Sequence, residues 1–191
     1  MGARVTYRTA RGNTVPYPPL FDEIRQNYGF VDTDGHPERI DEIPEIVRSA
    51  SLRSLLLDLA SPTSDFISLG CDLGESKNLD RRLSTRWVAG GYVQIMARDR
   101  EQQGVPVLQP LAKSIEARIK EESGKDNWEA DLALAPVVLA SEGEVMLQSV
   151  WTWFHARAAT LELARSSRER LLIALRDALR TAQRGSSTKS G

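Results

Sequence analysis

Val145-Met-Leu-Gln-Ser-Val-Trp-Thr-Trp-Phe-His155 is the stretch of sequence that decides the fold. It contains two of the four tryptophans and one of the two histidines of the chain, and its density of aromatic and β-branched residues is typical of a strand. Successive residues of a strand face opposite sides of a sheet. One side of this strand should therefore carry Trp151, Trp153 and His155, with Arg157 next in register.

Two questions about this stretch stay open at the level of sequence. Neither glycine nor proline occurs from residue 144 to residue 184, so one long helix is the alternative to a strand. The stretch is apolar nearly all round a helical wheel, however, which favours a strand buried on both faces. The face with Trp151 and Trp153 is either the core beneath a helix or a contact surface, because aromatic residues beside arginine are the composition of binding hot spots.

Hydrophobic periodicity predicts the elements that surround this strand. Strands are expected at residues 65–73, 87–97, 132–140 and 144–155, and helices at residues 41–60, 106–123 and 160–184. The order helix, strand, strand, helix, strand, strand, helix indicates an α+β fold, an antiparallel sheet of about four to five strands with helices packed on one face. Residues 39–184 should form this single domain, residues 1–38 an extended or hairpin appendage, and residues 185–191 a disordered tail.

Some segments allow more specific predictions. Residues 5–15 should form a small hairpin, and a short helix is expected at Phe21–Tyr28. Within residues 41–60 the apolar stripe changes sides at Ala50-Ser51, so either the helix breaks there or its second half is covered from a new side. Pro136 indicates a sheet edge or a bulge in the third strand.

Composition excludes several classes of protein. The chain of 191 residues is 41% hydrophobic and 27% charged, which is ordinary for a soluble globular protein. Its net charge of −1 is not that of a nucleic-acid polyelectrolyte binder, and no apolar run approaches the roughly 20 residues of a membrane span. The single Cys71 forms no internal disulfide, and no Cys/His cluster has zinc spacing. We therefore expect a cytoplasmic protein without a membrane contact, metal or cofactor.

One acidic stretch suggests enzymatic chemistry. Asp72-Leu-Gly-Glu75-Ser-Lys77 places carboxylates beside a lysine; carboxylates hold Mg²⁺, and a lysine can orient or activate the attacking water. The stretch resembles the PD-(D/E)xK nuclease pattern, and an early helix precedes it, as in that family. The resemblance implies a Mg²⁺-dependent nuclease that uses Asp72, Glu75 and Lys77. The alternative is a solvated, charged loop, because the triplet follows Gly74 in an expected loop from Gly74 to Arg86.

The segment that follows the aromatic strand is basic. From Arg157 to Arg184 there are seven arginines against three acidic residues, a local net charge of +4. Guanidinium groups suit phosphates and also the carboxylates of a protein partner. Arg168 falls inside the apolar stripe of the expected helix, where a charge must be paired or face an interface. An intrahelical salt-bridge face is the other interpretation of these charges.

Taken together, these patterns predict a non-enzymatic protein-binding or assembly module, a homodimer or a subunit of a larger complex. The contact residues are expected to be Trp151, Trp153, His155, Arg157 and Arg168. The element order is similar to that of type III secretion chaperones, and this resemblance implies dimerisation and the binding of unfolded protein segments. The Mg²⁺-dependent nuclease and a nucleic-acid-binding accessory protein remain the alternatives.

Overall fold

The computed structural model describes residues 2–21, 26–77, 86–100, 105–124, 126–143 and 145–187. Its principal elements follow the expected order of helices and strands. They are α1 (Ala50–Ala60), β5 (Phe66–Lys77), β6 (Trp87–Ala97), α2 (Val105–Glu122), β7 (Asn127–Leu139), β8 (Val145–Ala158) and α3 (Leu161–Ser187). The aromatic stretch is thus a strand, as its composition predicted, and the α+β class is confirmed.

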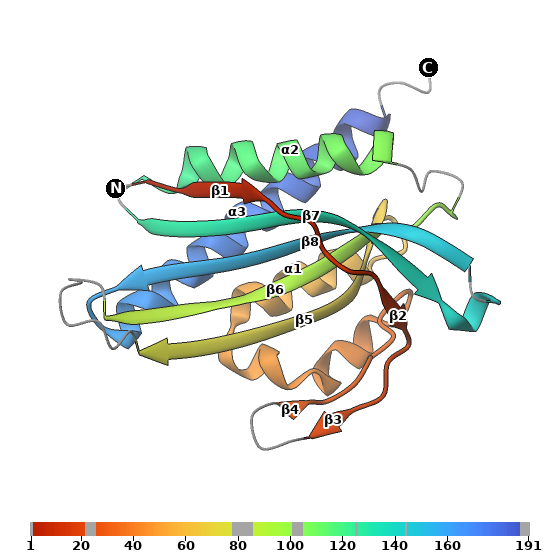
Figure 1. Ribbon diagram of the computed structural model, residues 1–191, viewed down its shortest axis with the longest axis horizontal. Coiled ribbons are helices and arrows are strands. Elements are labelled where there is room, and N and C mark those ends of the chain that lie inside the picture. The colour runs from red at the N-terminus through yellow and green to blue at the C-terminus, as the bar shows by residue number, and fades with distance from the viewer. Residues whose placement is uncertain are drawn as a thin grey trace.

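The sheet has six strands and is mixed (Figure 1). Its order is β1-β7-β8-β6-β5, and β2 also pairs with β7. The four long strands are antiparallel to their neighbours. In contrast, β1 (Arg4–Tyr7) and β2 (Asn13–Val15) run parallel to β7. The expectation of a purely antiparallel sheet of four to five strands is therefore wrong in its strand direction and in its strand count.

The N-terminal segment forms the outer edge of this sheet. Because β1 and β2 each pair with β7 and not with each other, the hairpin expected in residues 5–15 is wrong. On one side Pro136 lies opposite Gln148 of β8. On its other side β7 is unpaired at this residue, because Pro136 lies between the stretch that pairs with β1 and the stretch that pairs with β2. The edge position expected for this proline is therefore confirmed. The helix expected at Phe21–Tyr28 is also wrong: β3 (Leu20–Phe21) pairs there with β4 (Gln26–Asn27), and residues 22–25 lie outside the described part.

The segment before β5 breaks where the apolar stripe changes sides. Two 3₁₀ helices, η1 (Pro37–Glu42) and η2 (Pro44–Arg48), precede α1. The hydroxyl oxygen of Ser49 caps α1 by accepting a hydrogen bond of 3.0 Å from the Leu52 amide. At the other end of the chain, α3 continues to Ser187, so residues 185–187 are helical, and residues 188–191 lie outside the described part.

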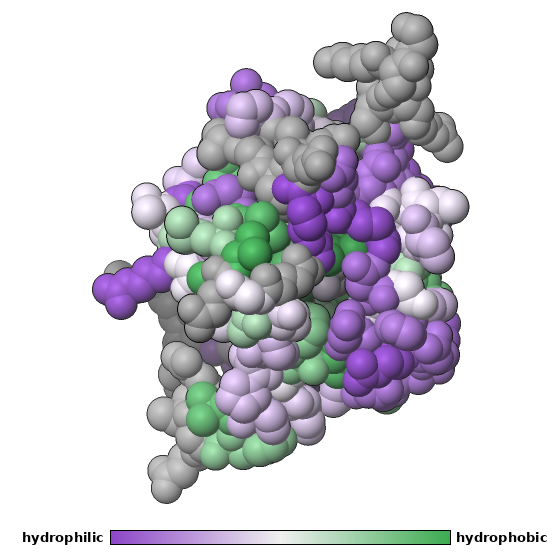
Figure 2. Space-filling view, turned by 90° about the vertical axis from the view of Figure 1, so that its right-hand side faces the viewer, coloured by the Kyte–Doolittle hydropathy of each residue, from purple (hydrophilic) through white to green (hydrophobic). Residues whose placement is uncertain are grey.

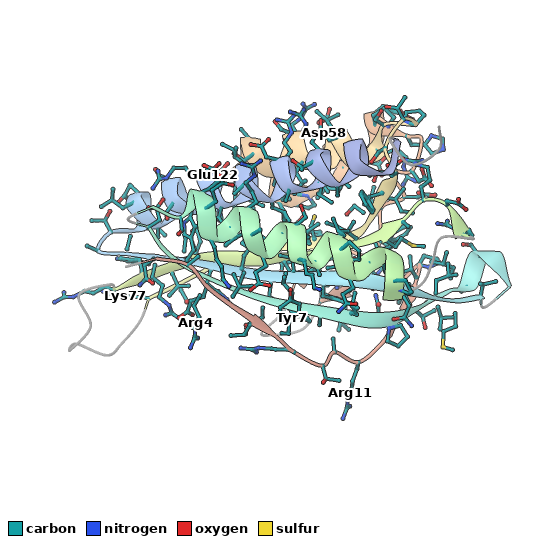
Figure 3. All side chains as sticks on the ribbon, turned by 90° about the horizontal axis from the view of Figure 1, so that it is seen from above. Arg4, Tyr7, Arg11, Asp58, Lys77 and Glu122 are labelled. Carbon is teal, nitrogen blue, oxygen red and sulfur yellow. The ribbon has the colours of Figure 1, made fainter. Side chains whose placement is uncertain are left out.

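The three helices pack on one face of the sheet, as predicted (Figure 3). Val150, Thr152 and Phe154 of β8 point toward them and are completely buried. Trp128 of β7 joins this main core and donates a hydrogen bond of 2.8 Å from Nε1 to the hydroxyl of Ser167 on α3. None of the helices in the described ranges has the length and apolar character needed to cross a membrane.

The opposite face, which we call the helix-free face, has a smaller core at one end. β2 and the adjacent ends of the long strands enclose Val15, Ile67, Leu69, Met96, Val137, Leu139 and Leu147. Figure 2 looks at this end of the molecule and shows scattered apolar areas separated by polar residues. The rest of the helix-free face belongs neither to this smaller core nor to the main core, so its side chains are the candidates for binding.

Candidate functional site

The binding residues that the sequence predicted on β8 lie on the helix-free face. Trp151, Trp153, His155 and Arg157 are all half-buried there. The rings of Trp151 and Trp153 stack with centroids 5.1 Å apart and planes at 14°. The Tyr92 ring of β6 continues the group, 4.9 Å from Trp151. We call these three residues the aromatic stack; it belongs to a partly open surface and not to the core beneath the helices.

Strand register positions this stack. Tyr92 lies opposite Trp153 on one side and opposite Asp72 on the other, so the three residues form a row across three strands. In the next row Gly90 lies opposite His155. A Cβ atom at Gly90 would stand only 2.6 Å from Cδ2 of His155, so glycine is what allows the imidazole to lie flat against β6.

A basic hollow of about 760 Å³ lies on the β7 side of the stack. Arg4 and Arg157 both pair with Glu129, at 3.4 and 2.8 Å, and Arg8 pairs with Asp131 at 2.7 Å. Arg11 also lines this hollow. Among the described lining residues, four guanidinium groups against two carboxylates give this hollow a positive charge.

Two groups in the basic hollow have no partner among the residues that the structure describes. Arg11 is exposed, forms no ion pair and points away from the sheet (Figure 3). Nε1 of Trp151 is buried and donates no hydrogen bond. His155 adds no charge at neutral pH, because burial and then the nearby Arg157 lower its pKa. Among the described residues, the hollow therefore has one exposed guanidinium group, that of Arg11, without a partner.

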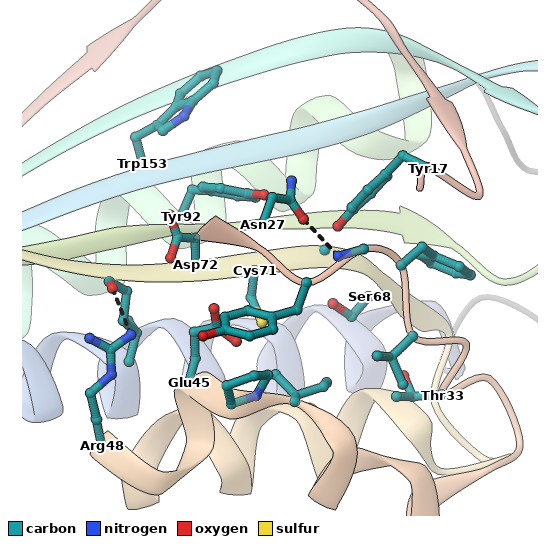
Figure 4. Close-up of a pocket in the computed structure, with 18 residues that line it drawn as sticks. Tyr17, Asn27, Thr33, Glu45, Arg48, Ser68, Cys71, Asp72, Tyr92 and Trp153 are labelled. Carbon is teal, nitrogen blue, oxygen red and sulfur yellow. Dashed lines mark hydrogen bonds between the residues drawn. The ribbon is translucent and has the colours of Figure 1, made fainter. Parts of the chain in front are cut away.

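An acidic hollow of about 870 Å³ lies on the other side of the stack (Figure 4). It is enclosed by the edge strand β5, by η2 and by residues 27–33, and it extends to Tyr92 and Trp153. Its charged groups among the described residues are Glu45, Asp72 and Arg48. The thiol of Cys71 also lines it, but burial raises the pKa of this thiol, so it stays protonated and unreactive.

The predicted nuclease residues do not come together. β5 continues as a strand to Lys77, so the loop expected from Gly74 is wrong over the residues the structure describes. Asp72 lies on the helix-free face, whereas Glu75 turns toward α3 and accepts hydrogen bonds of 2.8 and 2.7 Å from Arg165. Lys77 lies over the Trp87 ring, 5.7 Å from its centroid. Two carboxylates on opposite faces of a sheet cannot hold one metal ion.

The arginines of α3 pair with other elements. Arg168 is 1% exposed and donates a hydrogen bond of 3.0 Å to the main-chain oxygen of Arg48, with the carboxylates of Glu75 and Glu169 at 3.4 Å. The remaining pairs of α3, each at 2.7 Å, are Arg165–Glu75, Arg170–Asp126, Arg176–Asp58 and Arg180–Asp58. Apart from the Arg168–Glu169 contact, these partners lie outside α3, so the helix does not carry the intrahelical salt-bridge face considered from the sequence. Arg168 holds the fold together and is not at the surface.

Trp153 lines both hollows, so the helix-free face is one surface with opposite charges on the two sides of the aromatic stack. Sequence reasoning found the β8 side of this surface and missed Tyr17, Glu45 and Tyr92. These three residues come from distant segments, and no spacing in the sequence connects them. In comparisons with known proteins, no family model matches the chain, and neither a curated protein nor a solved structure matches it.

Proposed function

We propose that the protein is a non-enzymatic protein-binding or assembly module that holds a segment of a partner on its helix-free face. The partner is a second copy of the chain or another subunit of a complex. The observation that carries this proposal is the aromatic stack: Trp151 and Trp153 lie half-buried on the side of the sheet opposite the three helices.

The main core does not need these tryptophans. Val150 and Phe154, on the other side of the same strand, are fully buried and already fill the space under the helices. Large aromatic side chains left partly open are the usual centre of a binding hot spot. They bring contact area at a small cost in side-chain entropy, since each has only two rotatable bonds.

The rim of the surface supports the same proposal. The basic hollow has more guanidinium groups than carboxylates, and Arg11 and Nε1 of Trp151 have no acceptor among the described residues. An acidic segment laid over the basic hollow would pair with the exposed guanidinium group of Arg11. In this proposal the binding residues are Trp151, Trp153, His155 and Arg157, and the arginines of α3 serve the fold.

Light scattering over a concentration series tests the second-copy form of the proposal. If the chain dimerises through this face, Trp153→Ala should weaken self-association by about 30-fold, the effect of losing a hot spot of about 2 kcal/mol. Ile173→Ala is the matched control, because Ile173 is an apolar residue of α3 that is 48% exposed on the other side of the molecule. A dimer that both variants leave unchanged would contradict an interface at Trp153.

Site-specific photo-crosslinking tests the form with a different partner. A photoreactive phenylalanine analogue is placed at position 153 in one sample and at position 173 in another, and both proteins are expressed in their native host. A discrete adduct should form from position 153 and not from position 173. Equal yields at the two positions, or no adduct from position 153 in a protein that is also monomeric, would refute the proposal.

A further inference from the structure

The acidic hollow has aromatic walls. Tyr17, Phe30, Tyr92 and Trp153 line it, and the rings of Tyr17 and Phe30 meet edge to face with centroids 6.0 Å apart. Burial, as the largest cause, raises the pKa of Tyr17 to about 12, so its hydroxyl carries no charge at neutral pH. With a volume of about 870 Å³, the hollow is large enough for a small organic group.

Glu45 is a buried carboxylate that forms no salt bridge with any residue in the described ranges. It is 8% exposed, and its side chain rises from η2 toward β5 in Figure 4. No other side chain in the described ranges donates a hydrogen bond to it; its own main-chain amide is its single donor. The charge of Arg48 lowers the pKa of Glu45 slightly, but its guanidinium group donates a hydrogen bond of 3.1 Å to the carbonyl of Leu73 and not to Glu45.

The carboxylate of Asp72 adds a second negative charge to the hollow. Asp72 lines the same hollow from β5, so among the described residues two carboxylates and one guanidinium group line it. Burial raises the pKa of Glu45, and repulsion by Asp72 raises it further. A buried charge normally has a partner, because a charge left without one in the folded protein is strongly destabilising. The partner that would relieve this cost is a cation.

We propose that the acidic hollow binds an organic cation, an ammonium or guanidinium group, between its aromatic rings and the carboxylates of Glu45 and Asp72. Aromatic faces attract such cations through their quadrupoles, and carboxylates bind them with charge-assisted hydrogen bonds. A hard metal ion would instead need six or more oxygen ligands, which aromatic walls do not offer. The cation is supplied by a free amine or by a lysine or arginine side chain of a protein segment. This inference is independent of the proposed protein-binding function, since a small amine binds without a partner protein.

Titration of the purified protein with n-butylammonium, followed by calorimetry or by tryptophan fluorescence at constant ionic strength, tests the inference. 1-Butanol, which has the same alkyl chain and no charge, is the neutral control ligand and should bind much more weakly. Glu45→Gln should weaken butylammonium binding by about tenfold or more, because the charge of the carboxylate is lost while its shape is kept. Glu162→Gln, at an exposed carboxylate of α3, should leave it unchanged.

A second arm identifies the source of the cation. Acetyl-Gly-Lys-Gly-amide presents the same ammonium group on a peptide without terminal charges. Tighter binding of this peptide than of butylammonium assigns the hollow to a lysine side chain, and tighter binding of butylammonium assigns it to a free amine. The inference is overturned if neither probe binds better than 1-butanol, or if Glu45→Gln binds butylammonium as tightly as the wild type does.

The fold of the Glu45→Gln variant does not confound this result. The substitution removes a buried charge that forms no salt bridge in the described ranges, so the folded state should not lose stability at neutral pH. The pKa of Glu45 is raised in the folded state, so the wild type becomes less stable as the pH rises through that pKa. Glutamine does not titrate, so the variant should keep its stability over the same pH range. Its thermal midpoint at neutral pH should be equal to or above that of the wild type.

Discussion

Replacing the neighbours Trp153 and Phe154 by alanine, one at a time, should give very different losses of stability. Phe154 is 0% exposed and lies in the main core, where a phenylalanine-to-alanine change costs about 3–5 kcal/mol. Trp153 lies on the opposite face and remains half-buried in the folded protein. It loses its stack with Trp151, a pair worth about 0.5–1.5 kcal/mol beyond area burial. Because the alanine variant leaves an open surface and not a closed cavity, the total loss should be about 1–2 kcal/mol.

Urea denaturation followed by far-ultraviolet circular dichroism measures both losses. The two variants should keep the m-value of the wild type, so the shift in midpoint reports the change in the free energy of unfolding. Trp153→Ala should shift the midpoint by less than half as much as Phe154→Ala does. Equal shifts would mean that Trp153 belongs to a closed core, and the assignment of a binding surface to the helix-free face would then lose its basis.

Two further substitutions test the packing that positions this surface. Burial opposes the ionisation of Asp58, but the hydrogen bonds that Arg176 and Arg180 donate to its carboxylate outweigh burial and lower the pKa of Asp58. Asp58→Asn should therefore reduce the free energy of unfolding by about 1 kcal/mol at neutral pH. Because the pKa of Asp58 is lowered in the folded state, its charge stabilises the fold above roughly pH 4, and this contribution is lost as the pH falls through the folded-state pKa. The difference in the free energy of unfolding between wild type and variant should therefore shrink in acid. A difference that does not change with pH would contradict the ion pairs. Gly90→Ala would bring its Cβ within 2.3 Å of a main-chain oxygen of β8 and should cost about 1–3 kcal/mol in a urea titration, whereas Gly74→Ala, whose Cβ meets nothing within 4 Å, should cost much less.

The periodicity of apolar residues was sufficient to predict the helices and strands whose apolar residues recur at regular spacing. β6 has the bounds that its apolar run predicted, and β8 is a strand because its aromatic and β-branched residues favour one. The change of side in the apolar stripe at Ala50-Ser51 located the start of α1 to within two residues. In each of these cases the signal lies within about a dozen neighbouring residues.

Pairings between distant segments could not be predicted in this way. β1 and β2 are four and three residues long, and what makes them strands is the free edge of β7, more than 100 residues further along the chain. A short helix was expected at Phe21–Tyr28. Phe21 instead belongs to β3, and its ring meets that of Tyr28, just beyond β4, edge to face with centroids 5.5 Å apart.

The same distinction applies to the candidate site. Strand alternation predicted which residues of β8 share a face. It could not predict which of the two faces the helices cover, because that depends on how the connections between strands and helices run in the folded chain. Arg168 was expected to be paired or to face an interface, and its main partner is a main-chain oxygen of η2, which has no signature in the sequence. Glu45 gave no signal because only the folded chain brings η2 beside β5.

The parallel pairing of β1 with β7 also determines how the fold is completed during synthesis. Thr6 and Asp131, which form a hydrogen bond across this pair, are 125 residues apart in the chain. A ribosome adds about 5–20 residues per second, so β1 leaves it many seconds before its partner strand exists. Closing so long a loop costs entropy before any contact is gained. β1 should therefore dock last, and until it does, the nascent sheet keeps an unpaired edge at β7 to which another nascent chain or a chaperone can add a strand.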